Sequence, residues 1–309
     1  GSNNTTIGHS SLGANTTGAS NTSMGSEALD ANTTGGFNVA IGRQALTNNT
    51  TASNNTAVGR LALGANTTGN ENTAVGSLAA NDITTGTRNV AVGFNALNGL
   101  QTGQNNTGIG FAALDALSSN TFSNTAVGSL AGTGITSGQN NVAVGVASLS
   151  TCTTGGSNIA IGDEALQSLQ SSGENTAVGK ASAANLTTGS GNALLGFGVG
   201  SGLTTGNNNV LLGQNAGDSV TTGPSNVCVG NAAGDEITTG NNNICIGNNS
   251  GVSASGAALQ YVIGASCSGT ADFQITIGND SVGKIQNSYN SNATWTRTSD
   301  VRYKKDILD

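Results

Sequence analysis

Short apolar triplets recur along the chain, and each is closed by a glycine. With that glycine as position 0, position −1 is mostly Val or Ile, as in Ile7 and Val75, and position −3 is Thr, Val or Ile almost throughout. Position −2 is Ala in most repeats. β-Branched residues that alternate with period two are typical of strands. The pattern therefore predicts a short strand, about four or five residues long, that ends at each glycine.

These marker glycines recur with a nearly constant spacing. They stand 17 residues apart, except for one step of 18 between Gly110 and Gly128 and a last step of 14 that reaches Gly278. A fixed period of this kind indicates structural repeats that stack on one another. The marker glycines before the last step are Gly8, Gly25, Gly42, Gly59, Gly76, Gly93, Gly110, Gly128, Gly145, Gly162, Gly179, Gly196, Gly213, Gly230, Gly247 and Gly264.

A second apolar segment follows each glycine. Positions +3 and +4 often read Ala-Leu, as in Ala28-Leu29 and Ala96-Leu97, and a Thr-Thr-Gly turn comes next. We interpret this segment as a second short strand. Such a unit buries its apolar residues only if each strand pairs in parallel with its counterpart one repeat away. The sequence thus predicts an all-β fold, a parallel β-solenoid of 17-residue coils with two short strands per coil.

Alternation along the first strand defines two faces, and both are apolar. We expect positions −1 and −3 to line the interior of the coil, with Ile83, Leu100 and other residues at position +7 adding to it. Position −2 is then expected on the outside, where a solvated face would be polar. An apolar stripe on a surface marks a contact with another molecule, so we predict self-association along this stripe. The stripe comprises Ala40, Ala57, Ala74, Ala91, Leu194, Leu211, Cys228, Cys245 and Val262.

Position −4 is Asn in every repeat from Asn4 to Asn243. Asn tolerates left-handed backbone and bonds to nearby backbone groups, so a structural role in the turn before the strand is favoured over a binding role. A ladder of stacked Asn amides is a further possibility for this column.

Composition narrows the function classes. Charged residues make up 8% of the chain, aromatic residues 3%, and the net charge is −7. So few basic residues cannot neutralise many phosphates, which argues against nucleic acid as a partner. No long apolar run is present, so no membrane-spanning helix is expected. Cys152, Cys228, Cys245 and Cys267 fit no metal-ligand spacing and are interpreted as small apolar filler, with no metal or cofactor expected.

The motif Asn-x-Ala-Val/Ile-Gly, followed by x-x-Ala, resembles the head repeat of the YadA-like trimeric autotransporter adhesins. The resemblance covers residues 3–278, although the repeat of that family is commonly shorter. It implies a left-handed parallel β-roll assembled as a homotrimer. The number three comes from this resemblance and not from the residue pattern.

The pattern breaks after Gly283, and the end of the chain reads differently. The stretch SDVRYKKDI at 299–307 resembles the opening of the intramolecular chaperone domain of phage tail fibres and endosialidase tailspikes. The resemblance implies self-cleavage between Thr298 and Ser299, with Ser299 as nucleophile and Lys304 as its partner. The alternative is a helix start with Ser299 as N-cap. We therefore expect a solenoid over 1–283, a linker over 284–298 and the start of a truncated chaperone domain over 299–309.

Three functions remain open. The favoured one is an adhesive, homotrimeric fibre segment, extracellular on a phage tail or a bacterial surface, with a host glycan or protein as possible receptor. An ice- or surface-binding solenoid is an alternative, because Thr-Thr-Gly recurs along the chain. An enzyme is disfavoured: the adjacent carboxylates Asp163-Glu164 and Asp235-Glu236 fall at outer turn positions and are interpreted as solvated charges.

Overall fold

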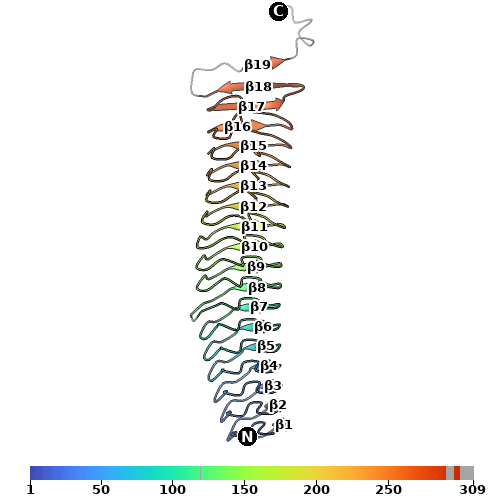
Figure 1. Ribbon diagram of the computed structural model, residues 1–309, viewed down its shortest axis with the longest axis vertical. Coiled ribbons are helices and arrows are strands. Elements are labelled where there is room, and N and C mark those ends of the chain that lie inside the picture. Colours follow the sequence, from blue (N-terminus) through green and yellow to red (C-terminus); the bar gives the residue numbers. More distant parts are fainter. Residues whose placement is uncertain (119, 290–295, 300–309) are drawn as a thin grey trace, which may run out of the picture. The chain divides into compact units, whose positions relative to one another are not determined.

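The computed structural model describes residues 1–118, 120–289 and 296–299, the last four by their backbone alone. It confirms the predicted all-β fold, a parallel β-solenoid built from coils of 17 residues (Figure 1). Within these ranges there is no helix, and so none that is long and apolar enough to cross a membrane. The chain divides into two compact units, Gly1–Glu164 and Ala165–Asp309.

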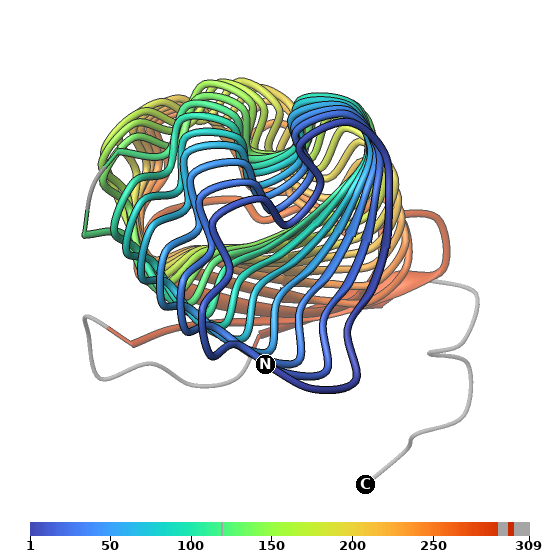
Figure 2. The same cartoon turned by 90° about the horizontal axis from the view of Figure 1, so that it is seen from below.

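In the described part of unit 1, ten strands of three residues each are stacked. Neighbours pair in parallel, residue for residue, as Thr56 with Thr73 and Ala57 with Ala74. Seen end-on, successive coils of this unit follow nearly the same path (Figure 2). Its strands are β1 (Thr5–Ile7), β2 (Thr22–Met24), β3 (Val39–Ile41), β4 (Thr56–Val58), β5 (Thr73–Val75), β6 (Val90–Val92), β7 (Thr107–Ile109), β8 (Thr125–Val127), β9 (Val142–Val144) and β10 (Ile159–Ile161).

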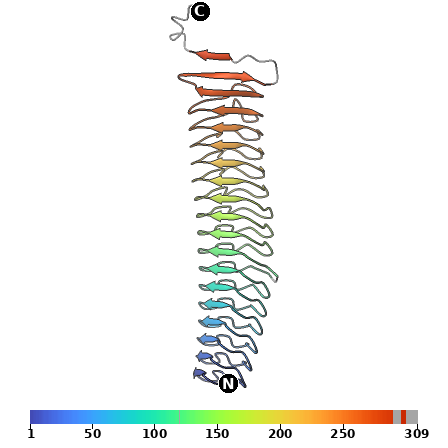
Figure 3. The same ribbon diagram turned by 180° about the vertical axis from the view of Figure 1, so that it is seen from behind.

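Unit 2 continues the pattern and then changes it. β11 to β17 pair in parallel, one strand per coil (Figure 3), but β18 pairs antiparallel with β17, and β19 pairs antiparallel with β18. β18 runs across the boundary that we predict at 283/284. The strands are β11 (Thr176–Val178), β12 (Ala193–Leu195), β13 (Val210–Leu212), β14 (Val227–Val229), β15 (Ile244–Ile246), β16 (Gln260–Ile263), β17 (Gln274–Asn279), β18 (Gly283–Ser288) and β19 (Thr296–Ser299).

The second strand that we predict in each coil is wrong for the described coils. After the marker glycine the chain runs as consecutive turns, because residues at +2 and +4 take positive φ, for example 59° at Gln44 and 53° at Leu46. A residue of left-handed backbone cannot continue a strand. The Leu side chains at +4 are nevertheless fully buried, as Leu29 and Leu97 show. The apolar residues after each marker glycine therefore indicate the core correctly, but they do not indicate a strand.

The predicted orientation of the first strand is also wrong. Position −2 faces the interior, where Ala57 and Ala91 are completely buried, while −3 and −1 point outward. The reason is space: the Leu at +4 and the residue at +7 already fill the coil, and only a small side chain fits between them. Position +7 does contribute to the core as predicted, with Ile83 and Leu100 fully buried.

Positions −2 and +4 share one volume inside the coil. Where −2 is Ala, +4 is commonly Leu, as in the pair Ala57 and Leu63. Where −2 is Leu, as at Leu194 and Leu211, +4 is Gly. A methyl group added to Gly200 would lie 2.6 Å from Leu194 Cδ2. The exchange of bulk between these two positions keeps the interior filled without strain.

The marker glycines are required by their backbone. Their φ angles lie between 129° and 147°, a region that is essentially restricted to glycine. They also stack closely: a Cβ on Gly42 would lie 2.6 Å from the carbonyl oxygen of Gly59 in the next coil.

The Asn column at −4 forms the predicted ladder inside each unit. Asn72 donates from Nδ2 to the carbonyl oxygen of Gly86 over 2.8 Å, and its Oδ1 accepts from the backbone N of Asn89 over 3.0 Å. These side chains are buried. The structural role is confirmed, but its mechanism differs from our prediction, because the left-handed residue is the preceding one at −5, such as Glu71 with φ 61°.

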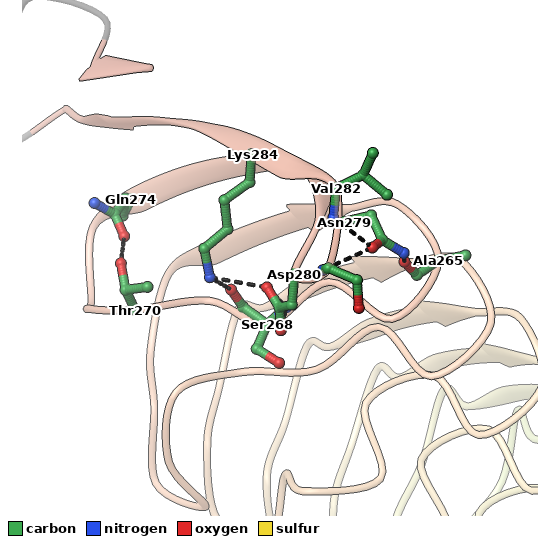
Figure 4. Close-up of polar contacts among 9 residues, drawn as sticks. Ala265, Ser268, Thr270, Gln274, Asn279, Asp280, Val282 and Lys284 are labelled. Carbon is green, nitrogen blue, oxygen red and sulfur yellow. Dashed lines mark hydrogen bonds and ion pairs between the residues drawn. The ribbon is translucent and has the colours of Figure 1, made fainter. Parts of the chain in front are cut away.

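The last coils of unit 2 are held by polar contacts around the β17–β18 hairpin (Figure 4). Lys284 Nζ donates to Asp280 Oδ1 over 2.9 Å and to the carbonyl oxygen of Ser268 over 3.0 Å. Asn279 Oδ1 accepts from the backbone N of Ser281 over 2.8 Å and from that of Val282 over 3.2 Å. The hairpin thus ends the parallel stacking at β17.

Candidate interaction surface

The outward side chains at −3 and −1 form one apolar strip on each unit, which we call the sheet face. In unit 1 these twenty residues, from Thr5 and Ile7 to Ile159 and Ile161, are aliphatic side chains, Met24 or Thr, and none is charged. Ile7 is 58% exposed and Ile109 37%. In-register pairing aligns them in two parallel columns.

The area of the sheet face of unit 1 follows from the number of strands and their spacing. Nine steps of about 4.8 Å extend it over about 43 Å, and the two columns are about 7 Å apart along each strand. The strip therefore covers about 300 Å², within the size range of the largest apolar patch on a typical monomer, which is often functional. The contact stripe that we predict at −2 is corrected accordingly: −2 is buried in its own coil, and the exposed apolar surface lies at −3 and −1.

Unit 2 carries a sheet face of the same character. Over β11 to β17 the −3 and −1 side chains are aliphatic, apart from Thr176 and Tyr261. Leu195 is 53% exposed, and Ile246, Ile263 and Ile277 are also exposed. Each unit by itself thus presents strand side chains that a solvated face would not carry.

Sequence reasoning missed the phenylalanines. None of the six is buried, although Phe is ordinarily a core residue. Their repeat positions could have revealed this, because all of them flank the strand: Phe94, Phe111 and Phe197 stand at +1, Phe37 and Phe273 at −5, and Phe122 at −6. The buried hydrophobic residues of the described chain include no aromatic side chain.

The predicted self-processing pair cannot be assembled from the described residues. Ser299 is described through its backbone, which pairs with Gly283 in the β18–β19 ladder. Lys304 lies outside the described residues. The proposed roles of Ser299 and Lys304 therefore stay predictions.

The cysteines pack inside the coil, whereas the acidic pairs Asp163-Glu164 and Asp235-Glu236 lie at turns, each with its Glu exposed. Burial raises the pKa of the Glu236 carboxyl, with its neighbour Asp235 adding to the shift. Cys228 and Cys245 are paired in register in adjacent strands. All four cysteines are fully buried, which agrees with their predicted role as small apolar filler. Among the described side chains, no three His, Cys, Asp or Glu residues gather as a metal site.

The Thr-Thr-Gly columns are turns whose first hydroxyl is already engaged. Thr50 Oγ1 donates to the carbonyl oxygen of Thr67 over 3.1 Å, and Thr67 Oγ1 to that of Thr84 over 3.0 Å. The second Thr, as at Thr51 and Thr68, is exposed. Because the first hydroxyl of each such turn is engaged within the protein, the surface-binding alternative has less support.

Comparisons of the chain with protein-family models, with curated proteins and with solved structures found no match.

Proposed function

We propose that the chain is a structural and adhesive fibre segment that assembles as a homotrimer through its sheet face. The observation that carries this proposal is the uncharged strip at −3 and −1, which needs a cover in water. A second copy of this chain carries the same apolar strip and could cover it. Cyclic symmetry would then close the copies into a finite oligomer. The number three rests on the resemblance to the trimeric adhesin heads.

The setting of this fibre is also a proposal. The motif SDVRYKKDI supports a phage tail fibre over a bacterial surface adhesin, with maturation by cleavage before Ser299 in a longer chain. Both settings are extracellular, and both use the fibre for attachment to a host surface. The coils are proposed to serve as scaffold and contact surface, with no catalysis of their own.

The native mass tests the proposal directly. One chain has a mass of 30.1 kDa, so light scattering after size exclusion is expected to give about 90 kDa. Ile109→Lys places a charge on the sheet face and is expected to lower the mass toward one chain. Thr85→Lys adds the same charge at an exposed turn position and is expected to leave the mass unchanged. A wild-type mass of a single chain would refute the trimer.

A further inference from the structure

Two phenylalanine rings stack on the surface of unit 1. Phe94 and Phe111 stand at position +1 of neighbouring coils, with ring centroids 5.9 Å apart and planes inclined by 11°. The residues are 49% and 54% exposed. A pair of parallel rings held in water, where the described core contains no aromatic side chain, offers a flat apolar surface for recognition.

The pair belongs to a column of +1 residues that the backbone holds in line. The amide of Leu61 donates to the carbonyl oxygen of Arg43 over 3.0 Å, and that of Leu78 to the carbonyl oxygen of Arg60 over 2.9 Å. Equivalent bonds continue the line through every coil to Phe111. We call it the Arg–Phe column; it reads Arg43, Arg60, Ser77, Phe94, Phe111 and Ser129.

Ser77 opens a notch in this column. Phe111 stacks on the Phe94 ring from the following coil, and Ser77 holds the +1 position of the coil before Phe94. Arg60 lies one coil beyond Ser77, so the backbones of Arg60 and Phe94 are two steps, about 10 Å, apart. Ser77 carries only a hydroxymethyl group, so the smallest side chain of this stretch of the column stands between Arg60 and Phe94.

The guanidinium groups beside the notch are available. Arg43 and Arg60 are exposed and stand in adjacent coils. Within the residues that the structure describes, neither side chain has an ion-pair or hydrogen-bond partner. Two cations one coil apart repel each other, and an anion between them would relieve that repulsion.

We infer that the Arg–Phe column binds an acidic saccharide, one that carries a carboxylate on a sugar ring. The apolar C–H face of the ring packs on Phe94, and the carboxylate accepts hydrogen bonds from Arg60 and Arg43. Ser77 supplies a hydroxyl at the floor of the notch. This inference deepens the proposed function, because it names the class of surface molecule to which the fibre attaches.

Charge disfavours a single-stranded nucleic acid, the other ligand that combines anions with flat rings. Such strands need a basic groove that follows the backbone as well as a stacking platform. Unit 1 has only one further Arg, Arg88, and no Lys. A saccharide that carries a carboxylate on a sugar ring matches two adjacent guanidinium groups beside one stacking surface.

Calorimetric titration tests the inference on the full chain with a hyaluronan hexasaccharide and an oligogalacturonate hexamer. We expect at least one of these acidic probes to bind and the neutral cellohexaose to bind about tenfold more weakly or worse. The double variant R43A/R60A and the double variant F94S/F111S are each expected to weaken binding about tenfold or more. Arg88→Ala and Phe37→Ser are the matched controls outside the column and are expected to bind as the wild type does.

Several results would overturn the inference. The first is that neither acidic probe binds at concentrations up to about 10 mM. The second is that R43A/R60A binds the probes as tightly as the wild type does. The third is that an oligothymidylate binds more tightly than the saccharides. A loss of native mass in F94S/F111S would assign the rings to contacts between copies instead. If the chain is monomeric but binds the saccharide through its Arg and Phe residues, only the proposal of a trimeric fibre is refuted. If the chain is trimeric but binds no saccharide, only the proposal of this binding site is refuted.

Discussion

Replacing a marker glycine by alanine perturbs a close backbone contact between coils. At Gly230 the φ angle is 138°, and a Cβ would lie 2.5 Å from the carbonyl oxygen of Gly247. The conformation alone costs an L-residue about 1–3 kcal/mol. Relief of the overlap requires the backbones of two coils to separate, which adds about 1–3 kcal/mol. We therefore expect Gly230→Ala to lower the free energy of unfolding by about 4 kcal/mol.

Gly256→Ala is the matched control in the same unit. There the nearest atom to an added Cβ is Thr239 Oγ1 at 3.6 Å, and φ lies outside the left-handed region. The expected change is within about 1 kcal/mol. Circular dichroism during guanidinium unfolding and during heating measures both variants, and a difference of about 10 °C between their midpoints is expected. Equal midpoints would refute the argument that the glycine column sets the approach of the coils.

Two further substitutions probe the interior and the charges. Asn72→Ala removes the buried amide that bonds to Gly86 and Asn89, so a loss of about 3 kcal/mol is expected in the same unfolding assay, against little change for the exposed Asn48→Ala. Burial and the nearby Asp235 raise the pKa of the Asp218 carboxyl above 3.8. The protonated carboxyl therefore favours the folded state, and this stabilisation is fully present below pH 3.8 and is lost as the pH rises through the raised pKa. Asp218→Asn is therefore expected to raise the melting temperature at pH 7 by about 1 °C and to bring no gain at pH 3, whereas equal effects at both pH values would contradict the charge argument.

The repeat could be recognised from the sequence because the backbone conformation at position 0 requires glycine in every coil. Glycine alone adopts the φ of position 0, so its spacing of 17 residues gave both the coil length and the parallel register. The buried Asn column followed for a similar reason, since the same amide contacts recur in each coil.

The direction in which the strand faces was not readable from hydrophobicity. Both faces of the strand are apolar, and the larger side chains point outward, so a rule that buries the more hydrophobic side chain gives the wrong answer. The sequence does contain the missing signal. Gly200 and Gly217 at +4 accompany Leu194 and Leu211 at −2, and such an exchange of bulk requires that both positions face the same interior.

The candidate surface was misplaced for the same reason. An exposed apolar stripe was predicted correctly as a feature, but the inverted strand moved it from −2 to −3 and −1, and its role as a contact stays a prediction. The Arg–Phe column could not be recognised from single residues, because Arg60 and Phe94 stand 34 positions apart and are brought into one column only through the coil register.

The shared volume of −2 and +4 also bears on how such a chain can change over generations. A direct exchange of Ala and Leu for Leu and Gly needs two substitutions, and the order matters, because adding the large side chain first would overfill the coil. The coil of Ala126 and Gly132 shows the passable intermediate, in which both positions are small and Leu114 and Ile135 lie beside Gly132. Drift through coils of this kind lets neighbouring repeats diverge in sequence while the length of the coil stays the same.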